Sequence, residues 1–403
     1  MILTPERTPG LRRAAWRAIA LLAIVAVAVA ACGSDKKQTT AGVSAEPAGT
    51  TVSLALVGAL AGDNANLGIN IRNGAKLAVD EARMAGVKVE LKEFDTQGSP
   101  DQASTLKDHL ISDDTIIGIV GPAFSGETKA VLQPLETAGL VMISASATAA
   151  DIPSTVPGSR VFHRIVADDD VQGASAGKYI SLKLKAKTAA YIHDNTDYGK
   201  PLAEATQKAS EAAGVNTVGN AAIDPKSQDF TAAVNSMKVL KPDVIYYGGY
   251  YAEAARLKKQ LSDGGVTATF VSGDGTLDKG FIDLGGAAAD GAQISCACNL
   301  ATADSEGKLG EFARNYKQAN NGRNPGAYSA EAYDAANILI AGIKAGNTTR
   351  PKMLDYVDGI TQFAGISKTI RFEDNGNVKD TDVFFFEVKN GKIELLGSAA
   401  NLR

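Results

Sequence analysis

Short apolar segments rich in β-formers alternate with amphipathic segments of helical period from Thr51 onward. The alternation repeats at intervals of roughly 25 to 30 residues, the length of a βα unit. The first unit joins a strand expected at 52–60 to a helix whose apolar face includes Ile71, Leu77 and Ala82. This order of elements predicts an α/β protein with parallel sheets.

The βα pattern runs through the chain twice, with a restart at Asp168, Asp169 and Asp170. These three carboxylates are expected to cap and favour the N-terminus of a helix over 171–182. The strands expected before the restart are 52–60, 87–95, 116–120 and 141–143, and those after it are 189–193, 215–223, 244–247, 269–271 and 293–298. The helices expected in the second half are 200–213, 230–240, 252–261, 305–319 and 330–345.

Two doubly wound, Rossmann-like lobes joined by a hinge account for this pattern. The first lobe is expected to hold 51–167 and 300–380, and the second 168–299 and 381–403. A terminal β-hairpin is predicted from 382–389 and 392–396, with Asn390-Gly391 as its type I′ turn. Ligands of open α/β sheets bind beyond the carboxyl ends of the strands, so the cleft between the lobes is the expected site.

The N-terminus differs from the rest of the chain. Arg12, Arg13 and Arg17 precede an apolar run over 18–31, which is too short to span roughly 30 Å of hydrocarbon. The run ends in small residues before Cys32 and resembles a bacterial lipobox, so 1–31 are expected to be a signal peptide and Cys32 its lipidated first mature residue. An ordinary secretory cleavage site is the alternative. Residues 32–50 then have the composition of a flexible tether beside the lipid anchor.

Composition limits the classes of function. The chain of 403 residues is 45% hydrophobic and 21% charged, with a net charge of -4 and no basic block, which argues against a nucleic-acid partner. Apart from Cys32, the cysteines are Cys296 and Cys298, which could pair in an oxidising compartment. On an extended strand they would share one face and close a very tight ring, so free thiols are favoured over a disulfide. No metal-ligand spacing surrounds them, so neither a metal nor a cofactor is expected.

Two strand ends in the first half of the chain carry hydroxyl groups. Ser125 follows the buried strand 116–120 and opens a helix, where free N–H groups favour an anion such as a carboxylate. The alternative is that Ser125 only caps its helix. The next strand ends in a second run of hydroxyls, Ser144 to Thr148, and the two loops together favour an anion site.

Three strand ends in the second half carry phenols and an acid. Tyr198 lies in the loop after strand 189–193, and Tyr250 follows the glycines at the end of strand 244–247. Asp274, between two glycines, could offer a carboxylate to an ammonium group. Surface exposure, aromatic packing and a simple turn are the alternatives for these three residues.

Several short strings of the chain are typical of one family. The most specific is Tyr246-Tyr247-Gly248-Gly249-Tyr250-Tyr251, and supporting strings are Val57-Gly58-Ala59-Leu60-Ala61-Gly62, Asn73-Gly74-Ala75, Met142-Ile143-Ser144, Ile192-His193-Asp194, Tyr198-Gly199 and Asp229-Phe230. With these strings the chain resembles the Leu/Ile/Val-binding branch of type I periplasmic binding proteins, which serve ABC importers. The similarity covers nearly all of 51–390.

The resemblance implies roles for the residues that match the family's binding site. A ligand α-carboxylate is expected at Ser125 and Thr148, with backbone groups near Ser146 and Ala147. The α-ammonium is expected at Ser146 or Ala147, at Tyr198 and at Asp274. Tyr250 is expected to close over the ligand from the second lobe.

The chain departs from the family pattern at a few of these positions. Asp274 replaces a common Glu, so its carboxylate is one methylene shorter. Large aromatic residues often line the side-chain pocket near Leu67 and Ala330, where this chain has smaller residues. The pocket is therefore expected either to be wider or to have its wall at another position. Gly98 and Phe124 occupy the places of a cysteine pair found in some members.

The expected function is therefore an extracytoplasmic lipoprotein, anchored outside the bacterial membrane, that binds a small amino acid of branched-chain type by hinge closure. Its expected partner is an ABC permease, and a monomer is expected. The alternative is a sensor for an amide, urea or another amino acid that feeds a signalling partner. An enzyme is not expected, because His193 has no neighbouring nucleophile and no phosphate loop, dinucleotide fingerprint or nucleophile elbow is present.

Overall fold

The computed structural model describes residues 51–379 and 381–401, which lie within one compact unit, Gly49–Arg403. The expected signal peptide, the lipidation site Cys32 and the tether up to residue 50 lie outside the described residues. Within the described part of the chain, no helix has the length and apolar character needed to cross a bilayer.

The first sheet has five parallel strands in the order β2-β1-β3-β4-β5, which is a doubly wound arrangement. Its strands are β1 (Val52–Gly58), β2 (Val89–Asp95), β3 (Ile116–Val120), β4 (Met142–Ser144) and β5 (Phe162–Arg164). Every residue of β1 and β3 is buried, as expected for a sheet covered on both faces. We call this sheet and the helices packed on it the first lobe.

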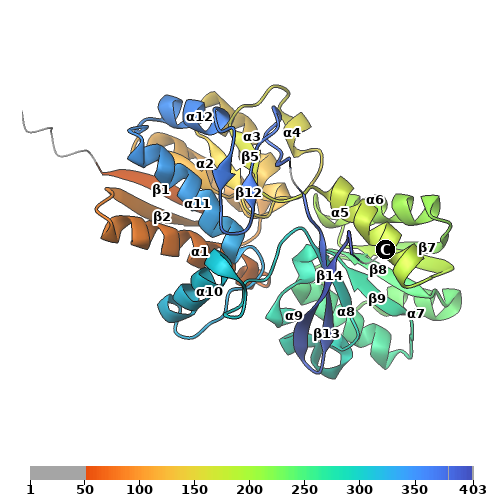
Figure 1. Cartoon of the computed structure of the whole chain (residues 1–403). Coiled ribbons are helices and arrows are strands. Elements are labelled where there is room, and N and C mark those ends of the chain that lie inside the picture. Colours follow the sequence, from red (N-terminus) through yellow and green to blue (C-terminus); the bar gives the residue numbers. More distant parts are fainter. Residues whose placement is uncertain (1–50, 380, 402–403) are drawn as a thin grey trace, which may run out of the picture. The chain divides into compact units, whose positions relative to one another are not determined.

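The second sheet has seven strands in the order β14-β13-β10-β9-β8-β6-β7. Strands β6 to β10 are parallel, and the terminal hairpin β13-β14 joins them antiparallel to β10. Its strands are β6 (Thr188–His193), β7 (Asn216–Ala222), β8 (Val244–Gly248), β9 (Thr269–Ser272), β10 (Gln293–Cys296), β13 (Phe384–Lys389) and β14 (Lys392–Ser398). We call this sheet and its helices the second lobe (Figure 1).

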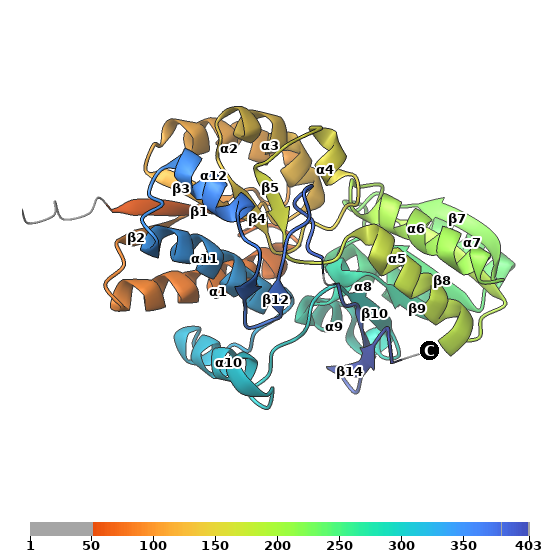
Figure 2. The same ribbon diagram turned by 45° about the horizontal axis from the view of Figure 1, so that its top comes forward.

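Helices cover both faces of the first sheet (Figure 2). Helices α1 and α11 pack together on one face, and α2 and α3 pack together on the other. The helices of this lobe are α1 (Ala65–Met84), α2 (Pro100–Ser112), α3 (Ser125–Thr137), α4 (Ile152–Thr155), α10 (Gly307–Ala319), α11 (Ser329–Lys344) and α12 (Arg350–Asp358). Segments on both sides of the second lobe in the sequence therefore build the first lobe.

The second sheet is covered in the same way, with α5 and α6 packed together on one face and α7, α8 and α9 beyond the other. Its helical segments are α5 (Asp169–Lys178), the π-helix η1 (Tyr179–Lys183), α6 (Gly199–Ala212), α7 (Thr231–Leu240), α8 (Tyr251–Asp263), the 3₁₀-helix η2 (Asp274–Thr276), α9 (Lys279–Gly285) and the 3₁₀-helix η3 (Gly286–Ala289). Both lobes are thus doubly wound, as predicted.

Local sequence signals explain where helices begin. Ser99 caps α2 by accepting the N–H of Gln102 at 3.4 Å, and Pro100 follows at the first helical position. Asp168 caps α5 by accepting the N–H of Val171 at 3.0 Å. The predicted cap at the acidic run is therefore confirmed, and Asp168 is the residue that makes it.

The terminal hairpin follows its predicted turn. Asn390 and Gly391 both have positive φ, 51° and 68°, as a type I′ turn requires. Other elements were not predicted, because they are short or lack a clear period: β5, α4, α9, α12 and the small hairpin β11 (Phe363–Ala364) with β12 (Thr369–Ile370).

The expectation of free thiols at Cys296 and Cys298 is wrong, because the two residues form a disulfide with Cα atoms 5.0 Å apart. The prediction assumed that the strand continues to Cys298. Strand β10 instead ends at Cys296, and the chain bends through Ala297, so the second sulfur returns toward the first.

Candidate functional site

The first-lobe part of the site begins at the N-terminus of α3. The N-cap residue is Phe124, whose N–H donates to the Glu127 carboxylate at 2.9 Å. Ser125 is the first helical residue and does not cap the helix; its hydroxyl oxygen accepts the N–H of Ala149 at 3.1 Å. The Ser125 hydroxyl therefore joins α3 to the loop after β4.

The loop after β4 is fixed to the same helix start by hydroxyl groups. Ser144 Oγ donates to the carbonyl of Pro122 at 2.7 Å and accepts the N–H of Ala147 at 3.0 Å. Ser146 Oγ donates to the carbonyl of Ala123 at 2.5 Å. The two hydroxyl-rich loops singled out in the sequence thus lie side by side.

Arg164, at the end of β5, holds the loop after β4 by hydrogen bonds. It was not identified from the sequence as a site residue. Its guanidinium is fully buried and donates to the carbonyls of Ala147 at 3.2 Å and Ala149 at 2.8 Å. Burial lowers the Arg164 pKa, and the carboxylates of Asp168 and Asp169 oppose that shift. The arginine carries a positive charge beneath the loop.

Asp169 is a second residue that the sequence reasoning missed as a site residue. It lies in the first turn of α5, and its N–H donates to the carbonyl of Thr148 at 2.9 Å. Its side chain is 1% exposed, and among the described residues neither carboxylate oxygen makes a hydrogen bond of good geometry. The buried Thr148 hydroxyl, which makes no such bond either, lies near enough to favour the charged form of Asp169, as does the charge of Arg164. Burial, followed by the negative charge of Asp274, raises the Asp169 pKa well above its ordinary value.

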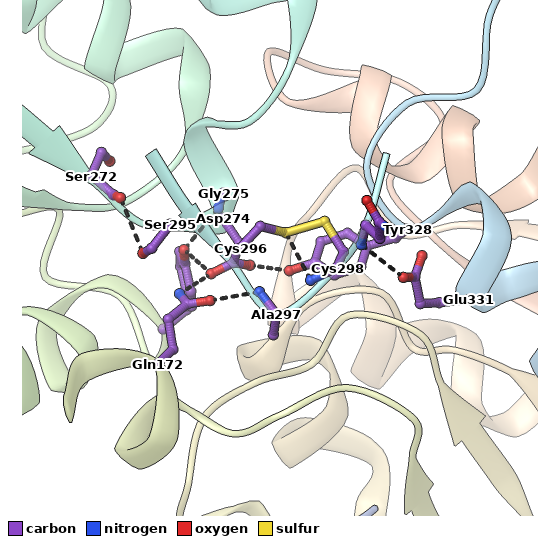
Figure 3. The surroundings of a disulfide bond; sticks show 12 residues. Gln172, Ser272, Asp274, Gly275, Ser295, Cys296, Ala297, Cys298, Tyr328 and Glu331 are labelled. Atoms are coloured by element: carbon purple, nitrogen blue, oxygen red, sulfur yellow. Dashed lines mark hydrogen bonds between the residues drawn. A yellow bond between two sulfur atoms is a disulfide. The ribbon is translucent and has the colours of Figure 1, made fainter. Parts of the chain in front are cut away.

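Asp274 begins η2, directly after β9, and is buried. One carboxylate oxygen accepts the Tyr198 hydroxyl at 2.8 Å and the Gln172 side-chain amide, and the other accepts the Tyr328 hydroxyl (Figure 3). The Tyr198 hydroxyl also accepts the N–H of Gly275 at 2.8 Å. Burial raises the Asp274 pKa, while its hydroxyl and amide donors oppose the shift.

Tyr328 changes the expectation for the side-chain pocket. It precedes α11 in the left-handed backbone conformation, with φ at 67°, and its phenol reaches Asp274 from the first lobe. Ala330, where a smaller wall was expected, packs instead with Leu77 and Phe312 in a separate core cluster. An aromatic ring therefore lies beside Asp274 two residues before Ala330, which fits the alternative of a relocated wall, and the shape of the side-chain pocket stays a prediction.

Tyr250 occupies the N-cap of α8 and bridges the lobes. Its N–H donates to the Glu253 carboxylate at 2.8 Å. Its ring centroid lies 5.0 Å from that of Tyr198 and 4.5 Å from that of Phe124 in the first lobe. The Phe124 ring in turn packs on Gly98. Some family members have a pair of cysteines at these two positions, and here the contact between Phe124 and Gly98 takes their place.

A second set of contacts joins the lobes at the start of α1. Asn66 donates its side-chain amide to Asp278 at 2.8 Å, and its N–H donates to the Tyr251 hydroxyl at 3.3 Å. Asn64 accepts the N–H of Ala252 at 3.3 Å. Leu67 follows directly in the first turn of α1 and is buried at this junction, and its role as a pocket wall stays a prediction.

A hollow of about 510 Å³ opens beside these rings, with Phe124, Tyr198 and Tyr250 among its lining residues. Lys129 of the first lobe lies at its edge, 2.8 Å from Asp151 and 3.4 Å from Asp197 of the second lobe. Charged and polar side chains therefore line this hollow, which lies beside the aromatic contact between the lobes.

A continuous series of contacts joins the expected site residues. Ser125 begins α3 and Thr148 lies in the loop after β4, both in the first lobe, and Asp169 links Thr148 to the neighbourhood of Asp274. Tyr198 and Tyr250 complete the series back to Phe124, which precedes Ser125. The arrangement places hydroxyls and a helix N-terminus on one side and two buried acids with phenols on the other.

Comparison with known proteins agrees with this architecture. The family model described as "Periplasmic binding protein" matches residues 51–392. The Leu/Ile/Val-binding protein BraC3 of Rhizobium johnstonii is 32% identical over 350 residues, which cover 85% of this chain and 93% of BraC3. A leucine-, isoleucine-, valine-, threonine- and alanine-binding protein of Pseudomonas aeruginosa is 28% identical, over 84% of this chain and 90% of its own.

Solved structures show the same fold. The leucine-binding protein LivK of Thermotoga maritima superposes with a TM-score of 0.79 at 25% identity, covering 86% of this chain and 98% of LivK. LivJ of Streptococcus pneumoniae, a branched-chain amino acid transporter substrate-binding protein solved with isoleucine, gives 0.78 at 26% identity, covering 86% of this chain and all of LivJ. The chain is therefore a member of the periplasmic binding protein family, with the type I fold of its Leu/Ile/Val-binding branch.

Proposed function

We propose that this protein is the extracytoplasmic substrate-binding component of an ABC importer and that it binds a small amino acid of branched-chain type between its lobes. The observation that carries the proposal is the buried Asp169 carboxylate, which makes no hydrogen bond of good geometry among the described residues and whose burial beside Asp274 is only partly offset by Thr148 and Arg164. A buried charge that is only partly compensated is costly, so a cationic ligand group beside Asp169 and Asp274 would relieve that cost.

The opposite end of the ligand would meet the first-lobe loops. Ser125, the Thr148 hydroxyl and the backbone at Ser146 and Ala147 lie next to the N-terminus of α3, whose partial positive charge favours a carboxylate. The α-carboxylate and the α-ammonium of an amino acid are attached to the same carbon. One ligand could therefore place its carboxylate at the first-lobe hydroxyls and its ammonium at Asp169 and Asp274. A zwitterionic amino acid matches both.

Closure of the lobes would complete this site. Tyr198, Tyr250 and Asp274 come from the second lobe and Tyr328 from the first, so bringing the lobes together places all four around the ligand. We place the hinge where the chain passes between lobes, near residues 165–168 and 297–307 and at the described residues 379 and 381–383. These crossings correspond to lobes of 51–167 with 300–380 and 168–299 with 381–403.

The proposal also covers attachment to the membrane and delivery of the ligand to the permease. Cys32 would carry the lipid anchor, residues 33–50 would tether the protein to the outer face of the membrane, and a monomer would deliver its ligand to the permease. The relatives named for transported amino acids support uptake over the sensing role.

Thermal unfolding with added ligand tests the proposal. We expect L-leucine, L-isoleucine or L-valine to raise the Tm, since a ligand at a hundred times its Kd stabilises by about 2.7 kcal/mol. Leucine amide, which lacks the carboxylate, and 4-methylpentanoate, which lacks the ammonium, should give little or no rise. Equal stabilisation by either analogue would contradict recognition of both ends.

A further inference from the structure

The disulfide between Cys296 and Cys298 lies where the chain leaves the second sheet for the first lobe. Cys296 is the last residue of β10, and the next helix along the chain is α10 of the first lobe. Both cysteines are buried, with 0% and 1% exposure. The three residues 296–298 therefore form a small closed ring inside the protein, beside Asp274 and Tyr328 (Figure 3).

One side of this ring is connected to the proposed ammonium site by a single side chain. The N–H of Ala297, between the two cysteines, donates to the side-chain oxygen of Gln172 at 3.0 Å. The side-chain nitrogen of the same Gln172 donates to Asp274. Gln172 is fully buried in α5, so both ends of its amide are committed to these two contacts.

The Ala297 N–H determines which way the Gln172 amide faces. A backbone N–H can only donate, so the amide oxygen must face Ala297 and the amide nitrogen must face the carboxylate of Asp274. The reverse orientation would put the amide oxygen against the carboxylate and leave the N–H of Ala297 unpaired, which is costly in a buried position. The position of the Ala297 N–H therefore sets which end of the Gln172 amide faces the Asp274 carboxylate.

The other side of the ring is connected to the first lobe. The N–H of Asn299, directly after Cys298, donates to the Glu331 carboxylate of α11 at 3.3 Å. Tyr328, three residues before Glu331, donates its hydroxyl to Asp274. The ring thus lies between Gln172 and Tyr328, two of the three side chains that donate to Asp274; the third is Tyr198.

A disulfide that closes so short a loop contributes least to global stability, because the chain entropy it removes grows with loop length. The effect of this disulfide is therefore expected to be local. It restricts the backbone of Ala297 in a bend that follows the end of a strand, and so it fixes the direction of the one N–H that holds Gln172.

We propose that the Cys296–Cys298 disulfide is a positioning element for ligand binding, which acts through the Ala297 N–H and Gln172 on the Asp274 carboxylate. The inference rests on the proposed function, since Asp274 matters here as the partner of a ligand ammonium. It assigns two residues, Gln172 and Ala297, to the support of that site.

A double-mutant cycle tests this inference. The full-length protein, the Cys296→Ala/Cys298→Ala variant, the Gln172→Met variant and the combined variant are titrated calorimetrically with L-leucine, L-isoleucine and L-valine. We expect loss of the disulfide to weaken binding at least fivefold, and Gln172→Met to weaken it at least as much. The combined variant should bind no more weakly than Gln172→Met alone, because both changes break the same connection.

The control is Val234→Ala on α7, a buried substitution in the second lobe away from the site. It should lower the Tm and leave the Kd unchanged, which separates general destabilisation from positioning. Mass spectrometry of the unreduced peptide that contains residues 296–298 should show it lighter by the hydrogens lost in the disulfide.

Three results would overturn the inference: two free thiols in that peptide, an unchanged Kd without the disulfide, or losses that multiply in the combined variant. A wild-type protein that binds none of the three amino acids would instead remove the proposed function, and the inference with it. The wild-type titration therefore distinguishes the two failures.

Discussion

Helices α3 and α8 begin in the same way in the two lobes. Each follows the end of a buried strand and has an aromatic N-cap, Phe124 or Tyr250. In each, a buried glutamate three residues later accepts the N-cap N–H, Glu127 at 2.9 Å and Glu253 at 2.8 Å. The two aromatic rings then meet across the lobes.

The surroundings of the two helix starts differ. In the first lobe, the hydroxyls of Ser125 and Ser146 are held by backbone groups of the same lobe. In the second lobe, Asp274 takes one of its donors, Tyr328, from the other lobe. If the lobes close on the ligand as proposed, we expect the first-lobe half to be preformed and the second-lobe half to be complete only in the closed arrangement.

The largest loss of binding is expected from Asp274→Ala. Removal of this carboxylate deletes a partner of the ligand ammonium and leaves the Tyr198, Gln172 and Tyr328 donors unpaired. Loss of a hydrogen bond to a charged group costs about 1.5 to 3 kcal/mol, so the Kd should rise at least tenfold. Calorimetric titration measures it, with the exposed Asp283→Ala on α9 as the control that should keep the wild-type Kd. An unchanged Kd for Asp274→Ala would remove Asp274 from the site.

A smaller loss is expected from Ser125→Ala. The helix N-terminus and the backbone of the neighbouring loop remain to bind the ligand carboxylate in place of the lost hydroxyl, so the cost should be no more than the low end of the range for a hydrogen bond to a charged group, about 1.5 kcal/mol. The same titration should show the Kd rising about two- to tenfold. Exposed Ser154→Ala in α4 is the matched control. A loss as large as that of Asp274→Ala would contradict the division between a preformed half and a completed half.

The smallest effect is expected on stability, from Glu127→Gln or Glu253→Gln. Burial raises both pKa values from 4.5 to about 7, so the folded protein holds protons that the unfolded chain releases. Their contribution to stability is present below pH 4.5 and is lost as the pH rises to about 7. Glutamine keeps an oxygen for the N-cap N–H without the charge, so each variant should gain about 1 kcal/mol or less at pH 8.

Urea unfolding at pH 5 and pH 8 measures this gain. Both variants should lose less stability than the wild type between the two pH values, and exposed Glu90→Gln should lose as much as the wild type. If only one of the two substitutions reduced the loss of stability between pH 5 and pH 8, the starts of α3 and α8 would not be equivalent.

The fold could be predicted from the sequence because its signals are periodic and local. Strands such as β3 are continuous apolar runs, and the predicted strands and helices lie within a few residues of those in the structure. The hairpin turn at Asn390 and Gly391 follows from residue type alone. Short elements such as β5 and β11 carry too few residues to show a period.

The candidate site could be predicted only at strand ends. Asp168, Asp169 and Asp170 are alike in sequence, and the direction of α5 decides that Asp168 caps the helix while Asp169 is buried. Gln172 and Tyr328 act through contacts with residues distant in the chain, which no local pattern reveals.

The disulfide could not be predicted for a related reason. The spacing of Cys296 and Cys298 was interpreted on an extended strand, and the bend at Ala297 that brings the sulfurs together depends on the crossover between the lobes.

The backbone conformation of Tyr328 has a consequence for the stability of the fold. A non-glycine residue in the left-handed region costs roughly 1 to 2 kcal/mol, and glycine adopts it without that cost. Glycine at position 328 would remove this strain but also the buried ring, and loss of a buried aromatic side chain costs about 3 to 5 kcal/mol. Burial of the ring therefore offsets the backbone strain, and substitution of Tyr328 is expected to lower stability and to remove the phenol contact with Asp274 together.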